Sequence, residues 1–466
     1  MWTRVHKRTK LGWTINLSTF SKDFIFGAAT SAYQIEGSTD SDGRLKSIWD
    51  SFGENSGLIA NGDTGAIACD HYRRWESDLD LISDLGLDAY RLSIAWPRLI
   101  TETGQPNENG FDFYERLLTK LRDSNIKPFV TLYHWDLPDW IQGRGGWVSR
   151  ETAYRFADYA DLASRRFSGL VEAWATVNEP WCAAWLGHGV GAIAPGLEDA
   201  GLAMSVGHHL MLGHGLALPA IRANDPGAKV GIANLCSPVT SATDTEADRR
   251  AAGYFLAGVN HWFLRPLLAG EYDERLFELR GCRPPTLPGD LEIMSRPMDY
   301  LGINYYRRGF VEADPKAFYR NVAPPAGERT QIDWEVYPEG LTELLVQIKS
   351  DYPNVPPIYI TENGMARDDE VVDGSVHDPE RIRYFERHLQ ALESAIASGV
   401  DVRGYFVWSL MDNFEWSYGY RPRFGLYHVD YTSQKRTAKD SAIWMRDYLA
   451  SRRLGRLATE ELATKE

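Results

Sequence analysis

The chain has 466 residues, of which 44% are hydrophobic and 24% are charged, a balance typical of a globular protein with a sizeable core. Its formal net charge of −14 argues against a polyanion such as DNA as the main partner, because phosphate binding requires clustered Lys and Arg side chains. No stretch approaches the roughly 18 consecutive apolar residues of a membrane span. The composition therefore predicts a protein with neither a nucleic-acid partner nor a membrane segment.

The cysteines and the N-terminus give the expected compartment. The four cysteines, Cys69, Cys182, Cys236 and Cys282, are too widely spaced for a zinc motif or a disulfide framework. The basic N-terminus is not followed by the apolar run of a signal peptide. We therefore expect a cytoplasmic protein, and the sequence leaves the oligomeric state open.

Short and nearly continuous apolar segments alternate along the chain with longer segments of helical periodicity. Continuous apolarity is typical of parallel strands that are covered on both faces. The predicted strands, in chain order, are Phe24–Ala29, Ala89–Ile94, Pro128–Tyr133, Val171–Val177, Lys229–Asn234, Met298–Tyr305, Pro357–Thr361 and Arg403–Ser409. This alternation predicts an α/β fold, a single (β/α)8 TIM barrel, and the length of the chain predicts extended βα loops.

The helix between the last two predicted strands has the clearest signals. Its apolar side chains recur at spacings of three and four residues, at Ile382, Phe385, Leu389, Leu392 and Ile396. Asp378 and Pro379 predict its start as N-cap and first helical residue, and Gly399 predicts its end. The rival fold, a doubly wound sheet, would require a glycine-rich phosphate loop after a strand, and the sequence contains none.

Two glutamates stand at the C-terminal ends of predicted strands. Glu179 ends Ala-Thr-Val-Asn-Glu-Pro, and Glu362 lies in Ile-Tyr-Ile-Thr-Glu-Asn-Gly. In a β/α barrel that end of the strands carries the catalytic residues. The two glutamates are therefore the strongest catalytic candidates.

A pair of carboxyl groups is what cleavage of a glycosidic bond requires, one to protonate the leaving oxygen and one to stay ionised. A separation of about 5–5.5 Å leads to retention of the anomeric configuration, and about 6.5–9.5 Å leads to inversion. Asn178 can donate to a sugar hydroxyl beside Glu179, and Arg91 can keep a nearby carboxylate ionised.

Several longer motifs make the chain recognisable. They are Phe26–Gly37, Tyr90–Pro97, Leu132–Pro138, Thr176–Pro180, Leu301–Tyr306, Ile360–Gly364 and Trp408–Trp416. Together they resemble glycoside hydrolase family 1, the retaining β-glucosidases, over nearly the whole chain. The resemblance implies hydrolysis of terminal β-D-glucosyl residues through a covalent intermediate, with some tolerance for galactosides and fucosides. Small β-glycosides are then the expected partners, and neither a cofactor nor a metal is expected.

The resemblance also implies a role for each matching residue. Glu179 is expected to be the acid/base and Glu362 the nucleophile. The expected substrate-binding residues are Gln34, His134, Trp135, Asn178, Asn304, Tyr306, Trp334, Trp408, Glu415 and Trp416, with Arg91 and Phe424 in support. On this reading, residues 1–16 form an N-terminal extension, 17–453 the catalytic barrel and 454–466 a polar tail.

Two alternatives stay open beside this function. One is a 6-phospho-β-glycosidase, which Glu415, Pro422 and Phe424 disfavour because this chain departs at all three from the phosphate-binding branch of the family. The other is a sugar-binding barrel without activity, which the presence of both glutamates disfavours. The intact Glu179 also favours O-glycosides over thioglucosides. His208, His209 and His214 lack the four-residue spacing of a zinc helix, so no metal site is expected there.

Overall fold

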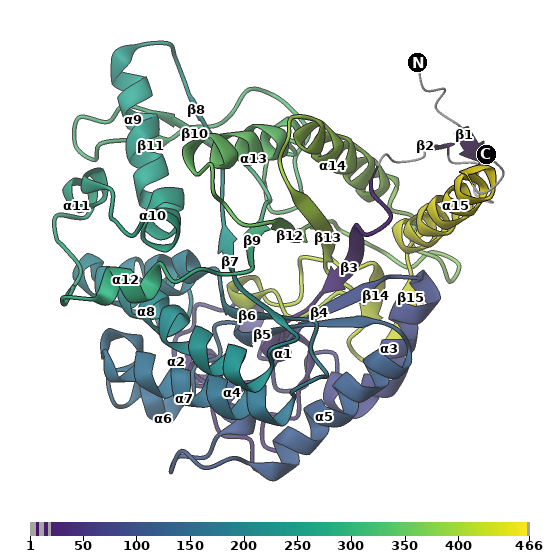
Figure 1. Cartoon of the computed structure of the whole chain (residues 1–466), viewed down its shortest axis with the longest axis horizontal. Helices are drawn as coiled ribbons and strands as arrows, with labels where there is room; N and C mark the ends of the chain where they lie inside the picture. The colour runs from purple at the N-terminus through teal and green to yellow at the C-terminus, as the bar shows by residue number, and fades with distance from the viewer. Residues whose placement is uncertain (1–5, 9–13, 17–19, 464–466) are drawn as a thin grey trace.

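Eight parallel strands close into a barrel in the computed structural model, which describes residues 6–8, 14–16 and 20–463 (Figure 1). In the order in which they neighbour one another, the strands are β3 (Ile25–Ala29), β4 (Ala89–Ser93), β5 (Lys127–Tyr133), β6 (Ala173–Asn178), β7 (Lys229–Leu235), β9 (Tyr300–Asn304), β12 (Ile358–Asn363) and β13 (Val402–Trp408). Each strand overlaps the segment predicted for it, and the predicted (β/α)8 barrel is confirmed.

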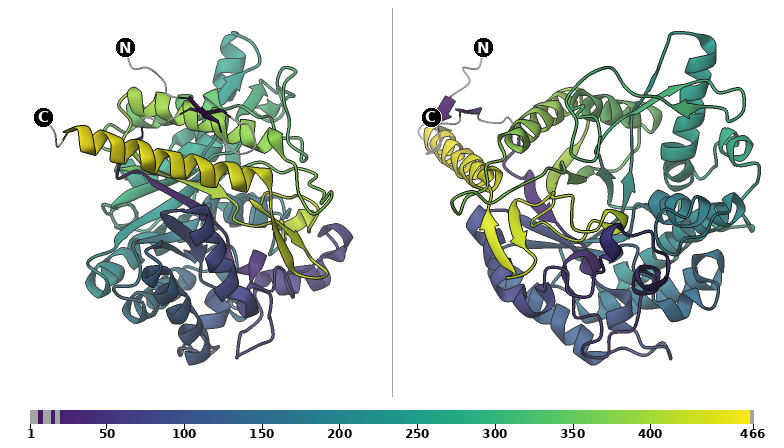
Figure 2. Two further views of the ribbon diagram at one scale, coloured as in Figure 1. Left: turned by 90° about the vertical axis from the view of Figure 1, so that its right-hand side faces the viewer. Right: turned by 180° about the vertical axis from the view of Figure 1, so that it is seen from behind.

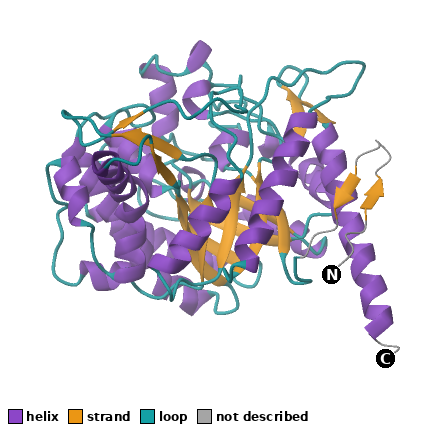
Figure 3. Ribbon diagram, turned by 90° about the horizontal axis from the view of Figure 1, so that it is seen from above, coloured by secondary structure: helices purple, strands orange, loops and turns teal. Residues whose placement is uncertain are grey.

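Helices surround the barrel and cover the outer face of its strands, as Figures 2 and 3 show from three further sides. The main ones are α3 (His71–Leu85), α5 (Glu108–Asp123), α7 (Glu151–Arg166), α8 (Ala200–Asn224), α10 (Trp262–Ala269), α13 (Glu339–Asp351), α14 (Pro379–Ala397) and α15 (Asp440–Ala463). Their apolar stripes form one large hydrophobic core with the outward-facing side chains of the strands. The barrel itself is filled by a second cluster that includes Ala89, Phe129, Tyr300 and Phe406.

The side-chain alternation of the strands directs polar residues into the barrel above this inner cluster. Ala89 belongs to the inner cluster, and Arg91 lies two residues further along the same strand. Because alternate residues of a strand point to the same face, Arg91 also faces the interior, where it is buried. The barrel therefore carries an apolar floor and a polar C-terminal end.

Helix α14 begins at Pro379 and follows the N-cap position Asp378, as the sequence predicts. The capping hydrogen bond is absent, however, because the Asp378 carboxylate is engaged elsewhere. It pairs with Arg381 and accepts hydrogen bonds from the backbone N–H and hydroxyl of Ser441. A buried guanidinium competes for the carboxylate more strongly than a free helix N–H group does.

The loops that follow the barrel strands are long, as expected. The loops after β7 and β9 contribute β8 (Val239–Ser241) and β10 (Gly309–Glu312), which pair in parallel, and β11 (Arg320–Asn321) extends that small sheet. The loop after β13 leads to a hairpin of β14 (Tyr427–Asp430) and β15 (Lys435–Ala438). These loops supply much of the wall around the cavity described below.

The two ends of the chain only partly belong to the described region. Within the predicted extension 1–16, β1 (His6–Arg8) pairs with β2 (Thr14–Asn16), and residues 1–5 and 9–13 lie outside the described residues. In the predicted tail, residues up to Ala463 continue helix α15. Among the residues described, no helix combines the length and the apolar character needed to cross a bilayer.

Candidate active site

Glu179 follows β6 directly and closes its C-terminal end. The backbone N–H of Glu179 still donates to the carbonyl of Ala233 on β7, at 2.8 Å, and the chain then turns at Pro180. Its φ angle of 44° lies in the left-handed region, which costs a non-glycine residue of order 1 kcal/mol or more. This conformation turns the side chain of Glu179 into the cavity, whose wall it forms.

Glu362 is the penultimate residue of β12 and lies beside a register irregularity in that strand. Such irregularities re-aim side chains near active sites. The turn that follows packs closely, because a Cβ atom at Gly364 would lie 1.8 Å from the carbonyl oxygen of Trp408. Only glycine therefore fits there, and Glu362 also lines the cavity.

A continuous hydrogen-bond network joins the surroundings of the two carboxyl groups. Arg91 donates to Glu362 at 2.5 Å and to the Asn178 side-chain oxygen at 2.6 Å. Asn304 donates to that same oxygen at 3.0 Å and to Glu179 at 2.7 Å. Side chains from four barrel strands and Glu179 itself are thereby fixed relative to one another.

The two carboxyl groups differ in the charges and hydrogen-bond donors that surround them. Burial and the negative charge of Glu362 raise the pKa of Glu179 to about 7, although hydrogen bonds from Asn304 and Cys182 oppose the rise. Glu362 instead forms an ion pair with Arg91 and accepts a hydrogen bond from the Tyr306 hydroxyl at 2.7 Å. Glu179 can thus hold a proton near neutral pH, whereas both carboxylate oxygens of Glu362 are engaged by donors.

Tyr306 and His134 are both held in defined protonation states. Burial and the charge of Glu362 raise the pKa of the Tyr306 phenol well above its usual value, so it remains a donor. Burial and the positive charge of Arg91 lower the pKa of His134 well below its usual value, so its ring is neutral. Because the Asn178 oxygen already accepts two hydrogen bonds, its amide nitrogen donates to His134 Nε2 at 3.1 Å. The other ring nitrogen of His134 is left to donate into the cavity region.

The cavity bounded by these groups has a volume of about 660 Å³. The structure places eight further predicted residues on its wall beside the two glutamates, and one predicted supporting residue. They are His134, Trp135, Asn178, Tyr306, Trp334, Trp408, Glu415 and Trp416, and the supporting residue Phe424. One carboxylate oxygen of Glu415 is buried and has no partner in the protein. An acceptor of this kind is available to a ligand hydroxyl group.

The aromatic residues form two groups on this wall. The ring of His134 lies 5.9 Å from that of Trp408 and 6.0 Å from that of Trp416, nearly parallel to both. On the other side, Trp334 packs edge-on against Tyr306 at 5.3 Å. Flat apolar rings beside free polar groups suit the alternating C–H and O–H faces of a sugar.

Three predicted residues lie behind the wall instead of on it. Arg91 and Asn304 act through the network around the carboxyl groups. Gln34 donates to the carbonyl of Phe414 at 2.8 Å and to the side chain of Asn413 at 3.1 Å, so it holds the segment next to Glu415.

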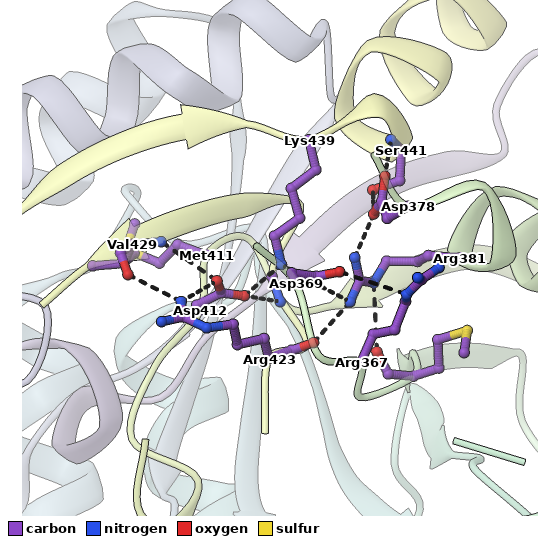
Figure 4. A network of polar contacts seen from close by, with 12 residues as sticks. Arg367, Asp369, Asp378, Arg381, Met411, Asp412, Arg423, Val429, Lys439 and Ser441 are labelled. Carbon is purple, nitrogen blue, oxygen red and sulfur yellow. Dashed lines mark hydrogen bonds and ion pairs between the residues drawn. The ribbon is translucent and has the colours of Figure 1, made fainter. Parts of the chain in front are cut away.

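A buried ionic network anchors the loop that follows β12 and the loop that carries Glu415 (Figure 4). Lys439 donates to Asp412 and to Asp369, each at 2.6 Å, and all three side chains are fully buried. Asp412 also pairs with Arg423 at 2.7 Å, and Arg381 joins Asp369 at 2.7 Å. The network therefore links the loop after β12 to the loop after β13, and the loop after β13 lines the cavity through Glu415 and Trp416.

Several wall residues carry no signal by which the sequence alone singles them out. Cys182 donates its thiol hydrogen to Glu179 at 3.1 Å, a contact made by the helical turn after Pro180. Trp181, Trp185, Arg307 and Tyr418 also line the cavity, and they come from the loops after β6, β9 and β13. The geometry of the loops places these side chains on the wall. In the sequence, only the three-residue spacing between Glu179 and Cys182 indicates that two of these side chains lie close together.

The histidines set aside in the sequence each have a protein partner. His208 contacts Asp290 and Tyr272, both at 2.9 Å, and His209 contacts the carbonyl of Trp147. His214 contacts the hydroxyl of Thr176 at 2.7 Å. Over the described part of the chain, no group of three or more His, Cys, Asp or Glu side chains is arranged to hold a metal ion.

A (β/α)8 barrel that gathers two buried carboxyl groups with different hydrogen-bond partners, free polar groups and flat rings in one cavity has the architecture of a glycoside hydrolase. The chain belongs to glycosyl hydrolase family 1, whose family model matches residues 16–453. The family resemblance seen in the sequence is thereby confirmed.

Relatives within the family share most of this chain. A bifunctional β-D-glucosidase/β-D-fucosidase of Bifidobacterium breve is 45% identical over 458 residues, which cover 92% of this chain and 98% of the relative. The crystal structure of the AHE enzyme from Alicyclobacillus herbarius superimposes with a TM-score of 0.91 at 45% identity, over 94% of this chain and 100% of that one. A family 1 β-glucosidase from Thermotoga maritima, in complex with isofagomine lactam, gives a TM-score of 0.91 at 41% identity, over 94% and 100% of the two chains.

Proposed function

We propose that the chain is a retaining β-glucosidase in which Glu179 is the acid/base and Glu362 is the nucleophile. The observation that carries the assignment is the difference between the two carboxyl groups, which face one cavity from β6 and β12. Both are buried, but Glu179 has a raised pKa, whereas Glu362 is paired with Arg91 and Tyr306. Family membership and relatives named as β-glucosidases at 40–45% identity support the same activity.

In the first step the Glu362 carboxylate attacks the anomeric carbon while Glu179 donates its proton to the departing glycosidic oxygen. The C–O bond to the leaving group breaks, and a covalent glycosyl ester of Glu362 forms. Tyr306 and Arg91 hold Glu362 in place, because each donates a hydrogen bond to a different oxygen of its carboxylate.

In the second step Glu179, now ionised, removes a proton from water, and the water oxygen attacks the anomeric carbon. The ester bond to Glu362 breaks, and the sugar is released with the configuration it had in the substrate. The charge on Glu362 disappears in the first step, which removes one of the two causes that raise the pKa of Glu179. The proton affinity of Glu179 therefore falls when it has to act as a base.

The sugar is held by the polar and aromatic groups of the inner wall. Glu415 and His134 bind its hydroxyl groups, and Trp408 covers one face of the ring. A 6-phosphate is disfavoured because a dianion would approach the carboxyl group of Glu415. Burial and the charges of Glu362 and Glu179 raise the pKa of Glu415 to about 8, which shows how strongly this region already resists negative charge.

The expected substrates are small β-glucosides and short oligosaccharides, with some tolerance for β-galactosides and β-fucosides. The four cysteines are free thiols, which suits a reducing compartment, and we place the protein in the cytoplasm. Cell fractionation tests the location, and recovery in a secreted fraction would contradict it.

Proton NMR of the first product tests the mechanism directly. With an aryl β-D-glucoside as substrate, β-glucose should appear first and then mutarotate, whereas initial α-glucose would contradict retention. Glu362→Ala should reduce turnover by several orders of magnitude, and near-normal turnover would refute the assignment of the nucleophile. The matched control is Glu54→Ala, which removes an exposed carboxylate that pairs with Lys46 and does not line the cavity.

A further inference from the structure

The segment between Tyr306 and Val336 forms a part of the cavity wall that is open to solvent. Arg307 and Asp333 are exposed, and Trp334 is half-buried, whereas Glu179 and Glu362 at the barrel end are only 5% and 3% exposed. Since this wall faces the mouth, it contacts whatever the sugar is attached to. We refer to the cavity-lining residues from Arg307 to Glu335 as the mouth wall.

The charged side chains of the mouth wall are three arginines and two carboxylates, so one positive charge is left over. Arg308 forms two hydrogen bonds with Glu335, both at 2.8 Å. Arg329 lies 3.3 Å from Asp333. Among the described residues, no carboxylate pairs with Arg307, and its charge is therefore the one that is not neutralised by a direct contact.

Arg307 is held close to the reacting groups and not simply on the surface. It directly follows Tyr306, whose hydroxyl group donates to Glu362. Its guanidinium carbon lies 5.4 Å from the ring centroid of Trp334, and that ring packs against Tyr306 and Phe424. A guanidinium over an indole ring is stabilised by a cation–π interaction that uses only the flat face of the guanidinium. The N–H groups at the edge of the guanidinium therefore stay free to donate hydrogen bonds.

The acidic groups and the unneutralised cation lie at opposite ends of the cavity. Three carboxyl groups, Glu179, Glu362 and Glu415, lie at its inner end, and the unneutralised cation lies at its mouth. An anionic group is therefore repelled from the sugar site and attracted to the mouth wall. The guanidinium fork matches a carboxylate through two parallel hydrogen bonds.

We propose that Arg307 is a specificity-determining residue that selects aryl β-glucosides whose aromatic leaving group bears a carboxylate. The inference rests on the proposed β-glucosidase function and names the class of leaving group. The aromatic ring of the leaving group packs beside Trp334, and its carboxylate pairs with Arg307. The sugar keeps its place among the inner polar groups.

The test compares two substrates that differ only in charge, 4-carboxyphenyl β-D-glucoside and its uncharged carboxamide. The wild-type protein should have a higher kcat/KM for the carboxylate. In Arg307→Gln the carboxylate-to-carboxamide ratio should fall roughly 3- to 10-fold, the range expected for a partly exposed ion pair with charge-assisted hydrogen bonds. Arg320→Gln is the matched control, since Arg320 is exposed, pairs with Glu312 and does not line the cavity.

Salt gives a second readout. Raising the ionic strength should lower the ratio in the wild-type protein but should not lower it in Arg307→Gln, because salt screens the attraction that only the wild-type protein has. A wild-type preference for the carboxamide, or an equal ratio in wild type and Arg307→Gln, would overturn the proposal alone. If neither glucoside is cleaved, the proposed β-glucosidase function fails and this inference fails with it.

Discussion

The hydrogen bond from Cys182 to Glu179 should set where the enzyme loses activity at alkaline pH. The thiol donates to the carboxyl group at 3.1 Å and lowers the pKa of Glu179, opposing burial and Glu362. Hydrogen bonds to charged groups contribute about 1.5–3 kcal/mol, and a thiol is a weak donor, so we expect about 1 kcal/mol. Cys182→Ala should therefore raise the pKa of Glu179 by roughly 0.5–1.

The pH dependence of kcat/KM measures this change, because it reports the pKa of the free enzyme's acid. Cellobiose is the substrate of choice, since its leaving group has to be protonated. Glu179 must carry its proton, so activity falls as the pH rises through about 7, and in Cys182→Ala that decline should move to higher pH. Cys182→Ser keeps a donor and should not move it upward. A decline that is unchanged in Cys182→Ala, or shifted to lower pH, would show that the Cys182 thiol does not lower the pKa of Glu179.

Three other substitutions test separate parts of the structure. Tyr306→Phe removes a hydrogen bond to the charged Glu362 and should lower kcat/KM roughly 10- to 100-fold in steady-state assays. The dependence of KM on the leaving group should stay unchanged. Lys439→Met removes the cation that two buried carboxylates, Asp369 and Asp412, share, and should lower the free energy of unfolding in urea by about 3–5 kcal/mol, whereas Lys316→Met at an exposed site should change it little. Because the folded-state pKa of Glu179 is raised from 4.5 to about 7, its contribution to stability is present below pH 4.5 and is lost as the pH rises through 7. Glu179→Gln should therefore raise the free energy of unfolding by about 2–3 kcal/mol more at pH 8 than at pH 4, which thermal unfolding at the two pH values measures. An equal effect at both pH values would contradict the raised pKa.

The barrel could be predicted from the sequence because each of its strands is buried on both faces. Segments such as Ile25–Ala29 and Tyr300–Asn304 are buried along their whole length, and they have the nearly continuous apolar pattern that marks parallel strands. The two glutamates could be located for a related reason, since Pro180 and Gly364 mark the ends of their strands.

The remaining features depend on contacts between distant segments. Gln34 lies behind the cavity wall because it bonds to Phe414, 380 residues away. Asp412 and Lys439 are isolated charges in the sequence, and only the packing of the loop after β13 against the start of α15 makes them a buried pair. The surplus charge at Arg307 emerges only after its neighbours have been paired in space.

In the proposed mechanism, Glu362 forms a covalent bond to the sugar. A 2-deoxy-2-fluoro-β-D-glucoside with a good leaving group slows both steps but favours the first, so the glycosyl ester accumulates. Peptide mass analysis of the inactivated protein should find the fluorosugar on the peptide that contains Glu362, and Glu362→Ala should take up no label. A fluorosugar attached to any other residue, or turnover of the compound without an adduct, would contradict the account.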